Sequence, residues 1–237
     1  MQAFLLAKKN YRENDQMATF YTKDLGKVEL VARGVKKIVS KNAPLLEPFS
    51  LLDIEIVGGK KYSYVTKVQT IESFSTIWKD LGKMTVGTMA SKYLDQIIKN
   101  GERDIRIFSL LNSLYKFLDN QKSVSEISGL QFLGRVACIF GYEPTLKKCV
   151  ICKKKTFTKV MFSNSDGGIV CLTCSRDKNI SGHIISNEGL KKLDFLIFGT
   201  KDAAQVKFSK REVSLFKDII FGYSAYHFGV RPGYIKF

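Results

Sequence analysis

The sequence predicts an α+β protein with an N-terminal β-barrel, a C-terminal helical bundle, and a four-cysteine segment inserted into that bundle. Short runs with alternating apolar residues fill the first part of the chain, and helical spacing of apolar residues follows. Two C-x-x-C pairs then interrupt the helical pattern. We therefore expect a barrel domain at residues 1–80, a helical domain at 81–148 and 175–237, and a small insertion at 149–174.

The barrel prediction depends on a series of short strands. They are expected at residues 3–9, 16–22, 27–33, 52–56 and 62–71. Gly58-Gly59-Lys60-Lys61 provides a hairpin turn before the last strand, and a longer connection from Gly34 to Phe49 follows the third. One long connection after the third strand fits a small Greek-key barrel, with an OB-fold as the leading candidate. An SH3-like barrel or a simple meander would give much the same pattern.

Helical periodicity begins at Phe74 and continues to Ile98, where Asn100-Gly101 is a stop signal. A second helix is expected over about 104–119. The sequence Ser123-Val-Ser-Glu126 is typical of a capping box and predicts a third helix that ends near Gly141. After the cysteine segment, two further helices are expected. Ser186 is the expected cap of the first, and Ser209-Lys-Arg-Glu212 is a capping box for the last.

The cysteine segment has the spacing of a four-thiolate zinc site. Cys149 and Cys152 form one pair, and Cys171 and Cys174 form the other. The apolar residues between the pairs are too few to fold without a metal, so we expect one structural zinc ion per chain. Four thiolates leave no coordination position for water, which excludes a catalytic metal. Two disulfides or two redox dithiols are the alternatives. The fifth cysteine, Cys138, is expected in the helical core.

The composition is strongly basic. The formal net charge is +16, from 38 Lys and Arg residues against 22 Asp and Glu residues. A polyanionic partner such as nucleic acid is therefore expected, with simple solubility as the alternative. Tyr11, Phe20 and Tyr21 could stack on bases or fill the barrel core. The expected DNA-binding cations lie on the first strand and around the third: Lys8, Lys9, Arg12, Lys27, Arg33, Lys36, Lys37 and Lys41.

The sequence gives little support for catalysis. It contains two histidines, His183 and His227, and neither has an obvious nucleophile or metal partner. Glycine-rich phosphate loops ending in Lys-Ser/Thr, G-x-G-x-x-G and H-E-x-x-H motifs are absent. We therefore expect a protein that is not an enzyme and has no small-molecule substrate. Without an export signal or an apolar run long enough to span a bilayer, a cytoplasmic, nucleoid-associated protein is expected.

Several motifs together resemble the RecO family of bacterial recombination mediators. The resemblance covers nearly the whole length and is carried by these strings: Tyr11-Arg-Glu-Asn-Asp15, Thr22-Lys-Asp-Leu-Gly26-Lys27, Ala32-Arg33-Gly34, Leu46-Glu-Pro48-Phe49, Gly141-Tyr142-Glu-Pro144 before the first cysteine pair, Gly167-Gly168 before the second, and Tyr226-His227-Phe-Gly229. One departure is Lys153, because a glycine often follows the second cysteine in the family.

The resemblance implies an OB-fold, a helical domain and a zinc module. It also implies binding of single- and double-stranded DNA, annealing of complementary strands, and cooperation with RecR in loading RecA onto DNA covered by single-strand-binding protein. The acidic C-terminal tail of single-strand-binding protein is an implied partner of the helical domain, whose two segments carry excess charges of +4 and +5. A zinc-containing protein-interaction adaptor and a metal-dependent nuclease remain as alternatives.

Overall fold

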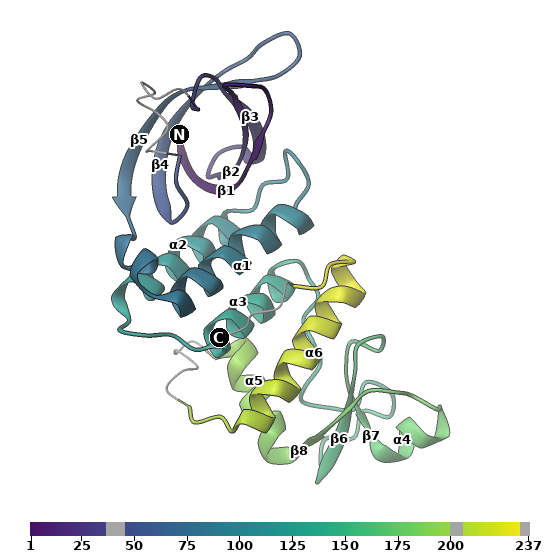
Figure 1. Ribbon diagram of the computed structural model, residues 1–237. Helices are drawn as coiled ribbons and strands as arrows, with labels where there is room; N and C mark the ends of the chain where they lie inside the picture. Colours follow the sequence, from purple (N-terminus) through teal and green to yellow (C-terminus); the bar gives the residue numbers. More distant parts are fainter. Residues whose placement is uncertain (37–45, 200–205, 233–237) are drawn as a thin grey trace. The chain divides into compact units, whose positions relative to one another are not determined.

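The computed structural model describes residues 1–36, 46–199 and 206–232 (Figure 1). By its internal contacts the chain divides into two units, unit 1 from Met1 to Ser123 and unit 2 beginning at Val124. Unit 1 contains the predicted barrel and the first two helices, and unit 2 contains the remaining helices and the cysteine segment. Among the described residues, no helix has the length and apolar character needed to cross a membrane.

Unit 1 opens with a closed five-stranded barrel. Its strands are β1 (Gln2–Asn10), β2 (Gln16–Thr22), β3 (Gly26–Ala32), β4 (Ser50–Val57) and β5 (Tyr64–Ser73). The strand order is β1-β2-β3-β5-β4, and β1 also pairs with β4 to close the barrel. Among these described strands, only the β3–β5 pairing is parallel, and it joins Val31 to Tyr64 and Ala32 to Val65. This Greek-key barrel confirms the predicted OB-fold.

Alternating apolar side chains fill the interior of the barrel. Ala3 and Leu5 on β1, Ala18 and Phe20 on β2, and Leu30 on β3 belong to one buried cluster. This period of two places every second residue inside the closed sheet, which explains why the strands were predictable from the sequence.

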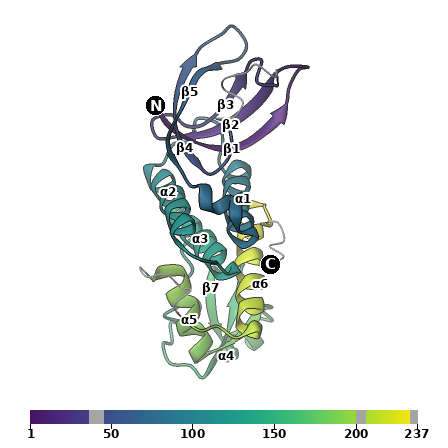
Figure 2. The same ribbon diagram turned by 60° about the vertical axis from the view of Figure 1, so that its left-hand side comes forward.

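One end of the barrel rests on two helices of unit 1 (Figures 1 and 2). The 3₁₀ helix η2 (Ser75–Lys79) leads into α1 (Leu81–Ile97), and α2 (Ile105–Asn120) follows. The continuous helix expected from Phe74 is therefore interrupted at Asp80, whose carboxylate accepts a hydrogen bond from the backbone N–H of Lys83 and caps α1. The ring of Phe4 on β1 packs against those of Phe108 and Tyr115 on α2, at centroid distances of 5.0 and 5.5 Å.

Unit 2 combines three longer helices with a small sheet. The helices are α3 (Glu126–Ile139), α5 (Asn187–Phe198) and α6 (Lys210–Phe228), and α3 contacts both of the others. The strands β6 (Lys159–Ser163), β7 (Gly168–Cys171) and β8 (His183–Ser186) form an antiparallel sheet in the order β7-β6-β8, and the short helix α4 (Leu172–Asp177) follows β7 (Figure 1). The cysteine ribbon is thus one strand larger than the sequence predicts.

The predicted helix caps are partly confirmed. Ser209 and Glu212 form the complete capping box of α6, and the Ser186 hydroxyl accepts a hydrogen bond at the start of α5. The expected box at Ser123 is wrong, because α3 begins later in the chain, with Ser125 as its N-cap. Glu126 is therefore the first residue of the helix, and its carboxylate pairs with Lys217 Nζ on α6 at 2.8 Å.

Lys27 links the barrel to α1 from the inside. Its side chain is buried, and its ammonium group donates to the carbonyl oxygens of Asp95 and Ile98 at the C-terminal end of that helix. It also forms an ion pair of 3.0 Å with the Asp95 carboxylate. The last carbonyl groups of a helix have no intrahelical partners and carry partial negative charge, so this lysine satisfies them. Lys27 was expected to bind DNA, but the structure assigns its ammonium group to this helix end.

Replacement of Lys27 by methionine should destabilise unit 1 by about 2 kcal/mol, because buried carbonyl groups lose a charged hydrogen-bond donor. The matched control is Lys67→Met, which removes an exposed ion pair with Glu55 and should cost less than about 1 kcal/mol. Urea unfolding of the two variants measures both effects. Equal destabilisation would contradict the structural role of Lys27.

Candidate metal centre and nucleic-acid interface

The four predicted metal ligands come together in unit 2. Cys149 and Cys152 lie on a tight turn in which the backbone N–H of Cys149 donates to the carbonyl oxygen of Lys154 at 2.8 Å. Cys171 ends β7 and caps α4, which contains Cys174. The four sulfur atoms all lie within 4.8 Å of one another. This arrangement fits a single tetrahedral ion held by four thiolates.

The local electrostatics also favour a cation at this position. Burial raises the pKa of the Cys149 thiol, but backbone N–H donors from Cys171, Cys152 and Ile151 outweigh it and lower the pKa to about 6. A hydrogen bond with Cys171, followed by burial, raises the pKa of the Cys174 thiol to about 12. Four thiolates this close repel one another, so full ionisation requires a positive ion among them.

The surroundings of the four cysteines contain little apolar material. Cys149, Val170 and Cys171 are the buried members of this cluster, and the other apolar side chains around them are only partly buried. A hydrophobic core of this size cannot stabilise the turn and the ribbon alone. A metal ion bound by the four cysteines would supply the stabilisation that a larger apolar core gives an ordinary domain.

Lys153 adopts the left-handed backbone conformation, with a φ of 63°. The family resemblance implies glycine at this position. The turn that carries Cys149 and Cys152 needs this conformation because the N–H of Lys153 returns to the carbonyl oxygen of Cys149 at 3.0 Å. The Lys153 ammonium group also donates to the carbonyl oxygen of Val150 at 2.6 Å. The departure from glycine therefore leaves the turn intact and adds backbone strain.

The predicted DNA-binding cations do not form one group. Lys8 pairs with Glu47 at 2.7 Å, and Lys9 lies 3.8 Å from Glu29, so carboxylates partly neutralise both. Arg12, Arg33 and Lys36 are exposed and lie at the end of the barrel opposite α1 and α2. Lys37 and Lys41 lie outside the described residues. Lys27, as shown above, is buried at the other end.

Backbone contacts hold Arg12, Arg33 and Lys36 at the same end. The N–H of Lys36 donates to the carbonyl oxygen of Asn14 at 3.2 Å, and its ammonium group reaches the carbonyl oxygen of Arg12 at 3.3 Å. The N–H of Gly34 donates to the Asp15 carboxylate at 2.8 Å. A surface depression of about 560 Å³ lies between the two segments and is lined by Arg12, Glu13, Asn14, Asp15, Arg33 and Gly34.

The β4–β5 connection adds residues that the sequence analysis did not select. Tyr64 begins β5, and Lys61 and Tyr62 closely precede it. The guanidinium carbon of Arg33 lies 3.8 Å from the ring centroid of Tyr64, and the rings of Tyr11 and Tyr62 are 5.5 Å apart. We call this end of the barrel the barrel tip, and define it by Tyr11, Arg12, Arg33, Lys36, Lys61, Tyr62 and Tyr64. The sequence signal is the pair Lys60-Lys61 beside two tyrosines, but the sequence pattern alone predicts a turn at the lysines and a strand at the tyrosines.

Of the three aromatic residues that could stack on bases or fill the barrel core, only Tyr11 is at the barrel tip. Phe20 is fully buried in the barrel core. Tyr21 is buried as well, and its hydroxyl group exchanges hydrogen bonds with the backbone of Asp104 at the start of α2. Phe20 therefore fills the barrel core, and Tyr21 is buried with its hydroxyl group on the backbone at the start of α2, so neither ring is available for stacking.

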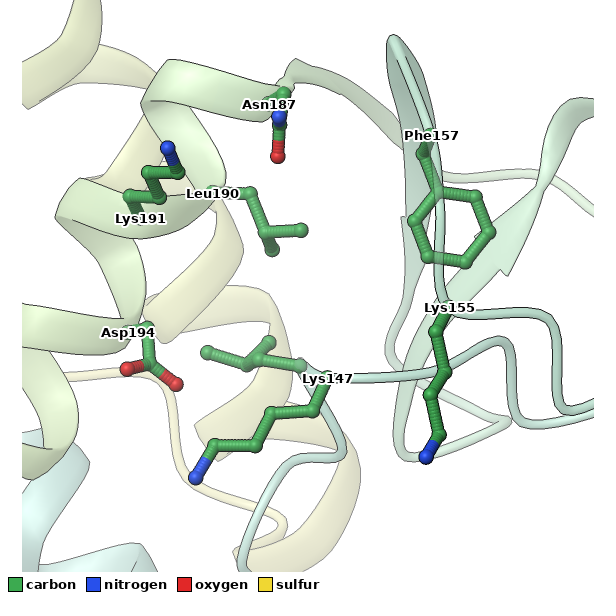
Figure 3. Close-up of a pocket in the computed structure, with 8 residues that line it drawn as sticks. Lys147, Lys155, Phe157, Asn187, Leu190, Lys191 and Asp194 are labelled. Atoms are coloured by element: carbon green, nitrogen blue, oxygen red, sulfur yellow. The ribbon is translucent and has the colours of Figure 1, made fainter.

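Unit 2 carries a pocket of about 300 Å³ (Figure 3). Its apolar part is formed by Leu146, Phe157 and Leu190, and the side chains of Phe157 and Leu190 project from opposite sides (Figure 3). Three lysines, Asn187 and Asp194 complete the lining; the lysines are Lys147, Lys155 and Lys191. A second depression of about 580 Å³ shares Leu146, Lys147 and Asp194 with it. The pocket thus combines an apolar centre with a rim of three lysines and one aspartate.

The described residues offer no further cluster of three or more histidine, cysteine or acidic side chains that could share a metal ion. His227 packs among aromatic rings, 4.2 Å from Tyr223 and 4.7 Å from Tyr142 between centroids, and burial lowers the pKa of its imidazole. This shift favours the neutral imidazole, and the ring serves as a packing residue. Burial, with a contribution from Glu143, raises the pKa of the Cys138 thiol to about 11, which makes it a poor nucleophile.

Replacement of Lys153 by glycine should stabilise the cysteine ribbon by about 1 kcal/mol, because glycine adopts the left-handed conformation without strain. The control is Lys154→Gly, at a neighbouring position without positive φ, which should be neutral or destabilising. Urea unfolding of the metal-loaded protein, monitored in unit 2 by hydrogen exchange, compares them. A Lys153→Gly variant that is less stable than Lys154→Gly would refute the prediction.

Comparison with known proteins agrees with this architecture. The family model for the N-terminal part of recombination protein O matches residues 1–74, which include the whole barrel. The model for the C-terminal part of recombination protein O matches residues 79–233. The two models together therefore cover almost the entire chain.

Individual relatives show the same similarity over most of their length. A DNA repair protein RecO from Thermoanaerobacter sp. (strain X514) is 29% identical over 204 residues, which cover 86% of this chain and 82% of the relative. The DNA repair protein RecO of Desulfatibacillum aliphaticivorans is 27% identical and covers 99% of this chain and 94% of its own length. That of Listeria monocytogenes serotype 4a (strain HCC23) is 26% identical over 78% of this chain and 72% of its own length. With both family models matched in order, the chain belongs to the RecO family of DNA repair proteins.

Proposed function

We propose that this protein is a recombination mediator that binds single- and double-stranded DNA without sequence preference. In this proposal it anneals complementary strands and, together with RecR, helps to load RecA onto DNA covered by single-strand-binding protein. The observation that carries the proposal is the barrel tip, where Arg12, Arg33 and Lys36 gather beside exposed parts of three tyrosines. OB-folds bind oligonucleotides through the connections between strands 1 and 2 and between strands 4 and 5, both of which contribute to this tip.

The physical basis of the proposed function is charge neutralisation. Cations that neutralise backbone phosphates release condensed counterions, which gives affinity without reading sequence. Strand annealing needs two phosphate backbones to approach each other, and a cationic surface reduces their repulsion. Annealing breaks no covalent bond and requires no catalytic side chain. His227, which packs among aromatic rings, and Cys138, whose thiol has a raised pKa, have no role in it.

Simultaneous replacement of Arg12, Arg33 and Lys36 by alanine should weaken binding of all DNA sequences alike. For single strands, the slope of log K against log salt concentration should fall by about 0.7 for each phosphate that is no longer neutralised. The control is Lys23→Ala, which removes an exposed cation at the opposite end of the barrel. Fluorescence anisotropy titrations at several salt concentrations measure affinity and slope. Unchanged binding in the triple variant would place the DNA-binding surface elsewhere.

We also propose that the ion bound by Cys149, Cys152, Cys171 and Cys174 is a structural Zn²⁺. The support is the all-thiolate ligand set, which suits zinc, and the closed coordination that it leaves. Elemental analysis should find one zinc per chain in the purified protein. Cys171→Ser should lose the metal and unfold the ribbon, whereas Cys138→Ser should retain it. A metal-free native protein, or a Cys171→Ser variant with unchanged metal content, would contradict this assignment.

We propose the pocket of unit 2 as the site for the acidic tail of single-strand-binding protein. An apolar side chain at the end of such a peptide would occupy the space between Phe157 and Leu190, and its carboxylates would face Lys147, Lys155 and Lys191. The support is charge complementarity combined with an apolar centre.

Calorimetric titration of the full chain with a tail peptide tests this site. Removal of the terminal aromatic residue should abolish most of the affinity, and Lys155→Glu with Lys191→Glu should weaken binding at least tenfold. The control variant Lys178→Glu changes an exposed lysine outside the pocket. Equal affinity for both peptides would leave only nonspecific charge attraction and rule out the pocket.

A further inference from the structure

Each of the three tyrosines at the barrel tip lies against a cation. Besides the contact of Arg33 with Tyr64, the guanidinium carbon of Arg12 lies 5.2 Å from the ring centroid of Tyr11. The ammonium group of Lys61 lies 5.5 Å from the ring centroid of Tyr62. The connections after β1 and before β5 each contribute a ring with its cation, and the connection after β3 contributes Arg33, which pairs with Tyr64 at the start of β5.

These rings do not serve as core residues of the barrel. The interior is filled by aliphatic side chains and Phe20, and none of the three tyrosines belongs to the buried cluster. All three remain partly exposed, in contrast to the buried Tyr21. Their arrangement therefore keeps aromatic surface available to a ligand.

The rings are also held in place before any ligand binds. Tyr11 and Tyr62 contact each other edge to face, with their ring centroids 5.5 Å apart and an interplanar angle of 74°. Tyr64 lies beneath the hairpin turn, so that a β-carbon added at Gly59 would approach its Cε2 atom to 2.5 Å. A β-carbon at the neighbouring Gly58 would meet no atom within 4 Å. Gly59 therefore allows the turn to close over the Tyr64 ring.

Such a surface distinguishes the two forms of DNA by chemistry. Both forms present phosphates to the cations, but only unpaired bases present free π faces. Aromatic rings and planar guanidinium groups both stack on bases, so the Arg33–Tyr64 pair offers a stacking plane on the outer face of Arg33. In a duplex the base faces are already covered by neighbouring base pairs, and the same rings gain little.

We propose that Tyr11, Tyr62 and Tyr64, with Arg33 stacked on Tyr64, select single-stranded over double-stranded DNA by stacking on unpaired bases. This inference rests on the proposed DNA-binding function and adds the residues that determine strand specificity. Removal of the rings reduces affinity for single strands and leaves the phosphate contacts, and hence duplex binding, in place. Strand annealing benefits from this difference, because the paired product is then held less tightly than the unpaired substrates.

The test compares Tyr62→Leu/Tyr64→Leu with Tyr62→Phe/Tyr64→Phe in the full chain. Affinities are measured for a mixed-sequence single strand and for the corresponding blunt duplex at one salt concentration. The leucine variant should bind the single strand about fivefold or more weakly for each base that no longer stacks on a ring, and its duplex affinity should be unchanged. The phenylalanine variant keeps the rings and should bind both forms as the parent protein does.

A milder pair of variants guards against misfolding. Gly59→Ala should displace Tyr64 and weaken single-strand binding only, whereas Gly58→Ala should leave both affinities unchanged. Unfolding curves show whether each variant is folded. If the leucine variant lowers single-strand and duplex affinity equally, or changes neither, stacking selection is wrong. The cation variants of the barrel tip decide separately whether the DNA-binding function itself fails, because their removal should affect both forms of DNA.

Discussion

The parallel pairing of β5 with β3 is the constraint on which the candidate DNA-binding surface depends. This short ladder closes the barrel, and it fixes Tyr64 beside Val31 at the end of β3. The β4–β5 connection is thereby brought to the same end as the turn after β1 and the segment after β3. Residues far apart in the sequence, such as Tyr11, Arg33 and Tyr62, become neighbours only through this closure. The opposite end of the barrel is occupied by α1, whose terminal carbonyl groups bind Lys27.

Unit 2 is organised by a different interaction. The segment that leads from α3 to the first ligand runs beside β7, where the N–H of Thr145 donates to the carbonyl oxygen of Gly167 and that of Ile169 donates to the carbonyl oxygen of Thr145, each at 2.9 Å. These hydrogen bonds attach the ribbon to the segment that follows α3, and the four cysteine sulfur atoms lie together where the two turns meet. The pocket lies where this connection, the segment before β6 and α5 meet.

Much of the fold could be predicted because local patterns determine it. Alternation predicted all five barrel strands within a few residues, and the cap at Ser209 was recognisable because its partner Glu212 lies three residues away. The cysteine spacing predicted the ligand cluster for the same reason. The capping box predicted at Ser123 is wrong because α3 begins at Glu126, whose carboxylate pairs with the distant Lys217 and does not return to the backbone at Ser123.

The remaining features depend on long-range contacts that no sequence window contains. The sequence around Lys27 does not distinguish it from other basic strand residues. Its buried position depends on contact with the C-terminal end of α1, which is distant in the sequence. The strand β8 is short, and it pairs directly with β6 although β7 and α4 separate the two strands in the sequence. Tyr62 and Tyr64 resemble ordinary strand residues, and their position beside Tyr11 and Arg33 follows only from barrel closure. The sequence therefore predicted most cations of the barrel tip. It did not predict two of its three aromatic residues, Tyr62 and Tyr64.

Hydrogen exchange measured by mass spectrometry, with and without a single-stranded oligonucleotide, tests most directly whether DNA binds at the barrel tip. Binding there should slow exchange in peptides that cover residues 10–15, 33–36 and 58–64, with little change around the β2–β3 turn at the other end of the barrel. Protection confined to that opposite end or to unit 2, with exchange at the barrel tip unchanged, would show that DNA binds elsewhere.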